Sequence, residues 1–147
     1  MDKKQAYLNE SLKHLQIAEH LTEVIFPLVN EKKLLLKILE QINKSVINSI
    51  NAANKKIIFR KEINPENKKK IIKQLEKLNL KKEQIRKILE IMEINQKHKK
   101  SAMEFERNNK AVIMMNDLNT ITLNIESIKE YLAIAKTFYI KVSSAFL

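Results

Sequence analysis

The sequence contains no cysteine, no glycine and no tryptophan, and only two prolines among its 147 residues. The absence of cysteine excludes disulfides, zinc fingers, iron–sulfur ligation and thiol nucleophiles. The absence of glycine argues against phosphate-cradling loops and tight hairpin turns, because both use backbone positions that glycine fills most easily. A strand–turn–helix nucleophile elbow is excluded for the same reason. The length suits one domain with a buried core, which we expect to span residues 1–147.

Positive charge is concentrated in the middle of the chain. Lysine and arginine number 28 against 17 acidic residues, for a net charge of +11. Residues 51–110 hold 15 lysines and three arginines against eight acids, whereas the segments on either side are nearly neutral. Lysine, isoleucine and asparagine all have A/T-rich codons, so a genomic origin for part of the lysine excess stays open. A uniform codon bias would not, however, confine the charge to one segment.

The sequence shows no targeting or membrane segment. The N-terminus leads into a mixed polar stretch without the apolar core of a signal peptide. The longest uncharged runs fall short of the roughly 20 apolar residues that a membrane-spanning helix needs. We therefore expect a cytoplasmic protein with no membrane partner.

Hydrophobic periodicity predicts two long helices in the first part of the chain. The first runs from about residue 3 to 28, and Pro27 is expected to kink or end it. The second runs from about residue 31 to 60. The first apolar stripe comprises Leu8, Leu12, Leu15, Ala18, Leu21, Val24 (or Ile25) and Leu28. The second comprises Leu35, Ile38, Leu39, Ile42, Val46, Ile50, Ala53 and Ile57.

Two shorter helices and a terminal helix are predicted next. The Asn-Pro-Glu sequence at 64–66 supplies a cap, a first-turn proline and a first-turn acid for a helix over about 65–78. A fourth helix is expected over about 81–97, and Asn124 caps a last helix that ends near residue 144. The inward side chains are expected to be Ile71, Ile72, Leu75, Leu78, Ile85, Ile88, Leu89, Met92, Ile128, Leu132, Ala135, Phe138 or Tyr139, and Val142.

Residues 99–124 lack helical periodicity. The segments 111–115 and 120–123 look extended, and the segment 116–119 between them is turn-like, which favours a small hairpin. The predicted fold class is all-α: a bundle of four or five helices with a small extended or hairpin excursion near 111–123.

A search for catalytic or metal-binding patterns finds none. No histidine has a glutamate three residues before it, so the ligand pattern of di-metal bundles is missing. His14 and His20 point to different sides of a helix. Glu10 and His14 are expected to form a surface pair, and Ser11 lies near His14 by coincidence. We expect no enzymatic activity, no metal and no cofactor.

A cluster of lysines on the third and fourth helices is the sharpest feature. Lys69, Lys73 and Lys77 recur at every fourth position, so they lie one above another on a helix. Such a cluster can neutralise phosphates and release counterions, which gives affinity that depends on salt and not on sequence. The alternative is a solvated face that only keeps the protein soluble. The candidate polyanion-binding residues are Lys68, Lys69, Lys70, Lys73, Lys77, Lys81, Lys82, Lys97, Lys99 and Lys100.

Ser45, Ser49 and Ala52 form a stripe of small side chains on the second helix. Small side chains let another helix approach closely. Packing against a helix of the same chain is one interpretation, and a homodimer interface is the other.

The order of two long helices, shorter ones and a terminal helix resembles the helical bundles of the HEPN superfamily. The stretches 18–29, 34–36 and 98–105 also resemble small uncharacterised archaeal proteins of that build. Active HEPN members are RNases with an arginine followed a few residues later by a histidine, and none of the three arginines here is followed in that way. The resemblance implies a non-catalytic member that dimerises or pairs with a nucleotidyltransferase.

Three functional hypotheses follow from these features. The first is a non-catalytic binding module whose lysine-rich middle contacts RNA or another polyanion through the backbone charge of that ligand. The second is a protein-interaction or homodimerisation bundle that uses the apolar remainder of the second or last helix. The third is a cryptic nuclease.

Overall fold

The computed structural model describes residues 3–54 and 63–145, which form a mostly helical fold with a small antiparallel sheet. Among these residues, no helix has both the length and the apolar character needed to cross a bilayer. The helices are α1 (Lys3–His20), α2 (Phe26–Val29), α3 (Leu34–Ala53), α4 (Pro65–Glu76), α5 (Lys82–Lys99) and α6 (Ile125–Ser144), and a short π-helix, η1 (Leu21–Ile25), joins α1 to α2. The strands are β1 (Met103–Arg107), β2 (Lys110–Met114) and β3 (Thr120–Leu123).

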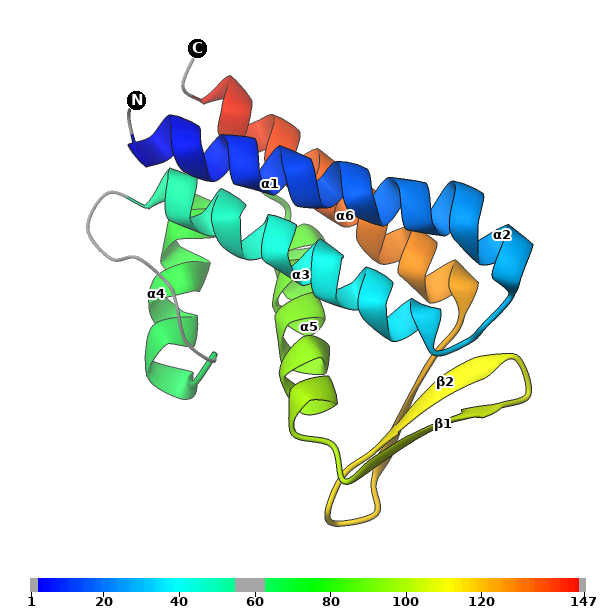
Figure 1. Cartoon of the computed structure of the whole chain (residues 1–147). Coiled ribbons are helices and arrows are strands. Elements are labelled where there is room, and N and C mark those ends of the chain that lie inside the picture. The colour runs from blue at the N-terminus through cyan, green and yellow to red at the C-terminus, as the bar shows by residue number, and fades with distance from the viewer. Residues whose placement is uncertain (1–2, 55–62, 146–147) are drawn as a thin grey trace.

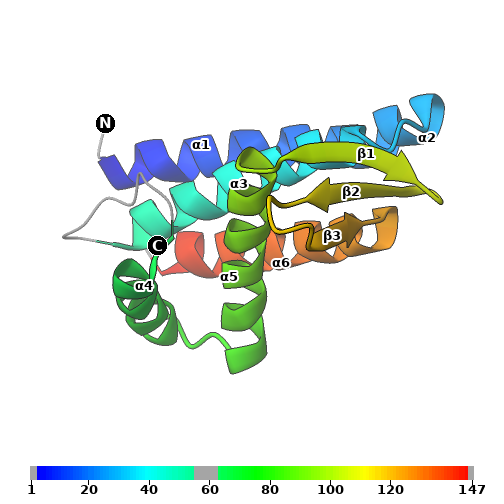
Figure 2. The same cartoon turned by 90° about the horizontal axis from the view of Figure 1, so that it is seen from below.

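Three long helices form one layer of the molecule. Helices α1, α3 and α6 lie side by side, with α3 and α6 running opposite to α1 (Figure 1). Helix α5 crosses this layer and contacts both α3 and α6, while α4 packs beside α5. The sheet lies near the start of α3 and of α6, away from α4 (Figures 1 and 2). Helix α4 and the sheet therefore occupy different parts of the surface.

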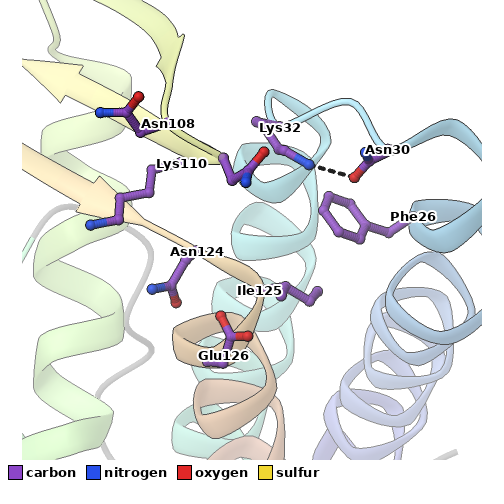
Figure 3. Close-up of a pocket in the computed structure, with 9 residues that line it drawn as sticks. Phe26, Asn30, Lys32, Asn108, Lys110, Asn124, Ile125 and Glu126 are labelled. Atoms are coloured by element: carbon purple, nitrogen blue, oxygen red, sulfur yellow. Dashed lines mark hydrogen bonds between the residues drawn. The ribbon is translucent and has the colours of Figure 1, made fainter.

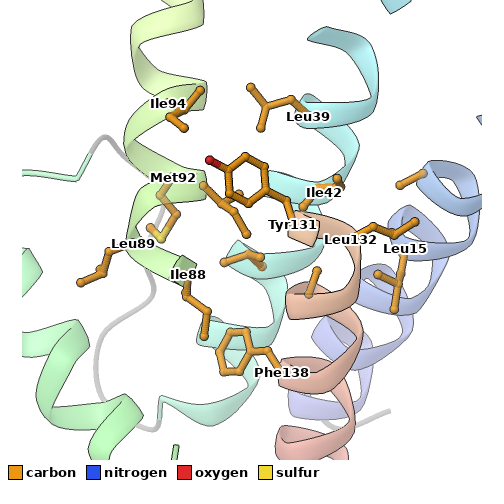
Figure 4. Packing of buried hydrophobic residues seen from close by; sticks show 14 of the residues in the cluster. Leu15, Leu39, Ile42, Ile88, Leu89, Met92, Ile94, Tyr131, Leu132 and Phe138 are labelled. Carbon is orange, nitrogen blue, oxygen red and sulfur yellow. The ribbon is translucent and has the colours of Figure 1, made fainter. Parts of the chain in front are cut away.

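Helix α3 lies at the centre of the hydrophobic core. It contacts α1, α5 and α6, so more than one of its faces is covered. Its predicted apolar stripe is confirmed from Leu35 to Ile50, while Ile57 lies outside the described residues. Figure 4 shows the core residues of α5 and α6 meeting those of α1 and α3. The largest fully buried side chains of the whole core include Leu35, Ile38, Leu39, Ile42, Leu75, Ile88, Ile91, Ile128 and Phe138.

Asparagine side chains fix the starts of α4 and α6, as predicted. Asn64 Oδ1 accepts from the Asn67 N–H at 2.9 Å, and the Asn64 N–H donates to Asn67 Oδ1 at 2.7 Å. Asn124 Oδ1 accepts from the Ser127 N–H at 2.8 Å, and the Asn124 N–H donates to Ser127 Oγ at 3.0 Å. Each reciprocal pair satisfies amides that the helix itself leaves without partners.

The second helix is shorter within the described residues than the sequence predicts. A turn over residues 31–33 precedes α3, and Asn54 leaves the helical region with φ −97° and ψ 122°. The predicted continuation over 55–60 lies outside the described residues. The fourth predicted helix, by contrast, is confirmed and extends to Lys99.

The first helix contains one irregular turn after α1 but keeps its buried face. In η1 the Phe26 N–H donates to the Leu21 carbonyl, five residues back instead of four. Thr22 and Phe26 follow Ala18 at four-residue steps and are buried, whereas Val24 and Leu28, which the stripe placed inside, are 45% and 78% exposed. The stripe was wrong at its end, because successive three-residue steps from Leu15 to Val24 turn the side chains by about 180° around a helix.

Pro27 explains why the helix is irregular at this point. Its nitrogen carries no hydrogen, so it cannot donate to a carbonyl one turn back. Two residues later α2 ends, and Asn30 adopts a left-handed conformation (φ 49°) while its N–H donates to the Phe26 carbonyl at 2.8 Å. The predicted end of the helix near residue 28 is confirmed.

The sheet has the order β1-β2-β3, with antiparallel pairing throughout. The β2–β3 pair confirms the hairpin predicted near 111–123. Strand β1 was not predicted. It extends the predicted hairpin to a three-stranded sheet. Its alternation was hard to recognise because Glu104 and Glu106 share the inner face with the buried side chains of Ala111 and Ile113, while Phe105 points to the outer face.

The turn between β1 and β2 overturns one expectation. Asn108 and Asn109 have φ angles of 49° and 63°, the left-handed pair that a two-residue hairpin turn requires. Asparagine reaches this region at a lower cost than most residues, because its short polar side chain can bond to the local backbone. The inference that a chain without glycine has no tight hairpin turn was therefore wrong.

Candidate polyanion-binding surface

The outward side of α4 and the turn into α5 carry a group of exposed lysines. On the opposite side of α4, the side chains of Ile71 and Leu75 are buried. Glu66 and Glu76 are the acidic neighbours on the exposed side of this helix. Within the described residues, none of these lysines makes a salt bridge. We call them the lysine face: Lys69, Lys70, Lys73, Lys77, Lys81 and Lys82.

Lys68 lies apart from the lysine face, on the side of α4 that meets α5. Its Nζ is 3.0 Å from Glu93 Oε1. Both side chains are about two-fifths exposed, so this pair contributes at most about 1 kcal/mol to stability. Lys68 thus joins α4 to α5, although the sequence analysis grouped it with the candidate polyanion-binding lysines.

Lys97, Lys99 and Lys100 lie in the last turn of α5 and just after it, about 22 Å of helix from Lys82. Lys97 also lines a pocket with Asn64, Pro65 and Lys68, so this end of α5 lies beside the start of α4. Positive side chains in a last helical turn also interact favourably with the carbonyl end of the helix, which gives this group a structural role. The ten candidate lysines are therefore spread along α4 and over both ends of α5.

The outer side of α5 does not connect the two groups, because acids there pair with its cations. Arg86 Nη2 is 2.5 Å from Glu83 Oε1, and Lys87 Nζ is 2.7 Å from Glu130 Oε1 on α6. The hydrogen bond with Glu130 raises the pKa of Lys87. The Tyr131 hydroxyl also donates to Glu90 at 2.9 Å, which ties α5 to α6 again.

The small-residue stripe is an interior contact of this chain. Ser45, Ser49 and Ala52 are all 0% exposed. Ser11 of α1 reaches them: its Oγ is 3.0 Å from Ser45 Oγ and 2.7 Å from Ser49 Oγ, and it donates to the Ser45 carbonyl at 2.9 Å. The stripe therefore packs α3 against α1 and is not available to a second copy. Among the described residues, α3 has no exposed large hydrophobic side chain, whereas α6 has Ile140, which is 60% exposed.

His98 takes part in a cluster that the sequence analysis missed. Its Nε2 is 2.8 Å from Glu40 Oε1 on α3, and its Nδ1 bonds to Glu104 Oε2 on β1. Burial alone would lower the pKa of His98, but the hydrogen bonds and charges of Glu104 and Glu40 raise it above its ordinary value. No sequence pattern connects these residues, because Glu40 lies 58 positions away. The described residues contain no group of histidine, cysteine and acidic side chains suited to a metal ion.

The Glu10–His14 pair forms as predicted. His14 Nε2 is 3.5 Å from Glu10 Oε2, and His14 Nδ1 is 2.7 Å from Gln41 Oε1. Ser11, three residues before His14, points into the α1–α3 contact and bonds to serines. These side chains have structural roles in packing α1.

A pocket of about 460 Å³ lies where α2, the β1–β2 turn and the start of α6 meet (Figure 3). Each asparagine in it is explained by the backbone: Asn30, Asn108 and Asn109 occupy left-handed positions, and Asn124 caps α6. The side chain of Lys32 bonds to Asn30. This lining is therefore a consequence of turn and cap chemistry. It comprises Phe26, Asn30, Lys32, Asn108, Asn109, Lys110, Asn124, Ile125 and Glu126.

No protein-family model, curated protein or solved structure matches this chain.

Proposed function

We propose that the protein is a non-catalytic module that binds RNA or a similar polyanion through the lysine face. The observation that supports this proposal is the exposure of six lysines on α4 and the following turn, without an acidic partner in the described residues. A lysine without a salt bridge can bind a phosphate at a lower free-energy cost than a paired lysine, because no existing ion pair has to be broken. The lysines at the far end of α5 and Lys68 are not part of this site.

Binding through these residues is expected to be independent of base sequence. Lysine presents a flexible point charge, whereas arginine presents a planar fork that reads phosphates and guanine edges with two bonds. The lysine face contains no arginine, and Arg86 of α5 is paired with Glu83. Contacts to the phosphate backbone fix the position of a ligand but carry no sequence information.

Salt dependence gives the proposal a measurable size. Each phosphate contact lowers the slope of log affinity against log salt by about 0.7 for single strands and about 0.9 for duplexes. Six contacts would therefore weaken binding by roughly 300-fold to 2000-fold between about 50 and 200 mM salt. A protein that binds through apolar surface would show little change over this range.

Replacing Lys69, Lys73 and Lys77 together by glutamate is expected to weaken binding of a labelled oligonucleotide by at least about tenfold. The variant loses three phosphate contacts and adds three repulsive charges, so its salt slope should fall by about 2–3. Fluorescence anisotropy over a salt series measures both quantities.

The matched control is the triple variant K13E/K37E/K44E, which changes the net charge equally. These three lysines are exposed on α1 and α3, away from the lysine face. The control is expected to retain most of the affinity and the salt slope. Equal losses in the two triple variants would refute a localised site, and no retention of any oligonucleotide at low salt would refute polyanion binding altogether.

A further inference from the structure

The outer face of the three-stranded sheet is a second surface with a distinct chemistry. Side chains that are directly opposite each other in an antiparallel sheet point to the same face. One face of the sheet therefore carries two rows of three side chains: Phe105, Val112 and Thr122 in one row, and Met103, Met114 and Thr120 in the other. The pair Arg107 and Lys110 lies at the end of this face next to the β1–β2 turn. Ala111, Ile113 and Leu123, at the alternate positions, are in the hydrophobic core. In the view of Figure 2 the strands lie in front of the helical layer, and no helix covers them.

The outer face is apolar at its centre and positively charged at its end. Val112 of the central strand is 5% exposed, Phe105 opposite it on β1 is half-buried, and Met103 is 57% exposed. Arg107 and Lys110 are exposed at the end next to the Asn108–Asn109 turn. Thr120 and Thr122 add exposed hydroxyl groups on β3.

The two acids of β1 point to the inner face of the sheet. Glu104 points inward and bonds to His98, and Glu106 Oε1 accepts from the Lys33 N–H at 3.0 Å. None of the eight residues in the outer rows is acidic. The sheet thus separates its charges, with carboxylates toward the helices and cations outward.

We propose that this outer face binds single-stranded nucleic acid by stacking an unpaired base on Phe105. A base has a flat π-face that an aromatic ring can cover, and this contact does not depend on base identity. Arg107 lies two positions further along β1, about 6.8 Å away in an antiparallel strand. Its guanidinium and the Lys110 ammonium can therefore hold the phosphate of a nucleotide whose base lies on Phe105.

A single strand fits this surface better than a duplex does. In a duplex both faces of each base are already stacked, so Phe105 would have no base to cover. The positive charge and the lack of outward carboxylates favour a polyanion over a neutral or basic protein partner. The inference stands apart from the lysine face, because the sheet lies away from α4 (Figure 2).

The test compares Phe105→Leu with Phe105→Tyr, using labelled twelve-nucleotide oligouridine and a twelve-base-pair RNA duplex. Phe105→Leu keeps apolar bulk in a half-buried position but removes the ring, whereas Phe105→Tyr keeps the ring. We expect Phe105→Leu to weaken oligouridine binding by between about fivefold and a hundredfold, with duplex binding changed by less than about twofold. Phe105→Tyr should bind as the wild type does. Circular dichroism of both variants verifies that the sheet and helices remain folded.

The outcomes separate this inference from the proposed function. Loss of single-strand binding in Phe105→Leu supports the sheet platform, even if K69E/K73E/K77E proves to have no effect. Equal oligouridine affinities of Phe105→Leu and the wild type would overturn the platform, whatever the lysine face does. Competition by polyglutamate as effective as that by polyuridine would also overturn it, because an acidic protein would then be the better occupant.

Discussion

Replacing Phe26 by alanine is expected to lower the free energy of unfolding by about 3 kcal/mol. Phe26 is 8% exposed and is the last buried side chain of the first helix. The Lys32 ammonium also lies 5.3 Å from the centre of its ring, where it gains a cation–π contact. Removing the ring would leave a cavity at the end of the core, and α2 would lose its buried side chain. Urea unfolding monitored by circular dichroism measures the loss.

Leu28→Ala is the matched control for this experiment. Leu28 belongs to the predicted apolar stripe of the first helix, but it is 78% exposed. Its truncation is expected to change stability by less than about 0.5 kcal/mol. A larger loss for Leu28→Ala than for Phe26→Ala would show that the end of the first helix buries Leu28 and exposes Phe26 in solution.

The elements that sequence predicts well are those encoded locally. Helix starts at Asn64 and Asn124 follow from cap chemistry within three residues, and the face of α3 follows from apolar spacing alone. The end of the first helix was predicted wrongly, although its spacing contains the buried face: Leu8 and Phe26 are 18 residues, or five full turns, apart. Phe26 is buried and Leu28 is exposed, as this spacing requires. Pro27 predicts an irregularity near this point, but the π-helical form of η1 could not be predicted from it.

Strand β1 shows a second limit of prediction from sequence. Period-two alternation is present in Met103–Arg107, but acids occupy the inward positions that are usually apolar. Those acids are accommodated by partners remote in sequence, His98 for Glu104 and the Lys33 amide for Glu106. Phe105 faces outward because Glu104 and Glu106 occupy the inward positions of β1. The stacking surface around Phe105 could therefore not be predicted from the sequence alone.

The candidate lysines were predicted one helix at a time, which explains what was correct and what was not. Lys69, Lys73 and Lys77 lie on one exposed face because they share one helix. The placement of Lys68 beside Glu93 and of Lys97 at the far end depends on how α4 packs against α5. That packing is set by apolar contacts between helices, which charge spacing does not report.

Raising the pH above about 6.5 is expected to destabilise the protein through His98. Both of its ring nitrogens face carboxylate oxygens, so only the imidazolium, with two N–H donors, satisfies both contacts. Burial lowers the pKa of His98, but the hydrogen bonds and charges of Glu104 and Glu40 outweigh it and raise the pKa above its ordinary value. Because the folded-state pKa exceeds the unfolded value of about 6.5, the stabilisation is complete below that pH. It is lost as the pH rises through the folded-state pKa.

His98→Gln removes this dependence and, at pH 6, is expected to cost about 2 kcal/mol of unfolding free energy. A neutral amide cannot donate along both former directions, which leaves the less exposed carboxylate, Glu104, without its charged partner. Urea unfolding from pH 5.5 to 8.5 and an NMR titration of the His98 ring protons measure the two effects.

His20→Gln is the control, because His20 is exposed on the first helix and should leave the pH dependence unchanged. Glu40→Gln and Glu104→Gln should each lower the pKa of His98, with the larger change for Glu104, whose side chain is 24% exposed against 39% for Glu40. A His98 pKa at or below its ordinary value would show that one carboxylate has left the ring. Since Glu104 belongs to β1, the sheet would then be held to the helices less firmly than the structure indicates, and the position of Phe105 would be correspondingly less fixed.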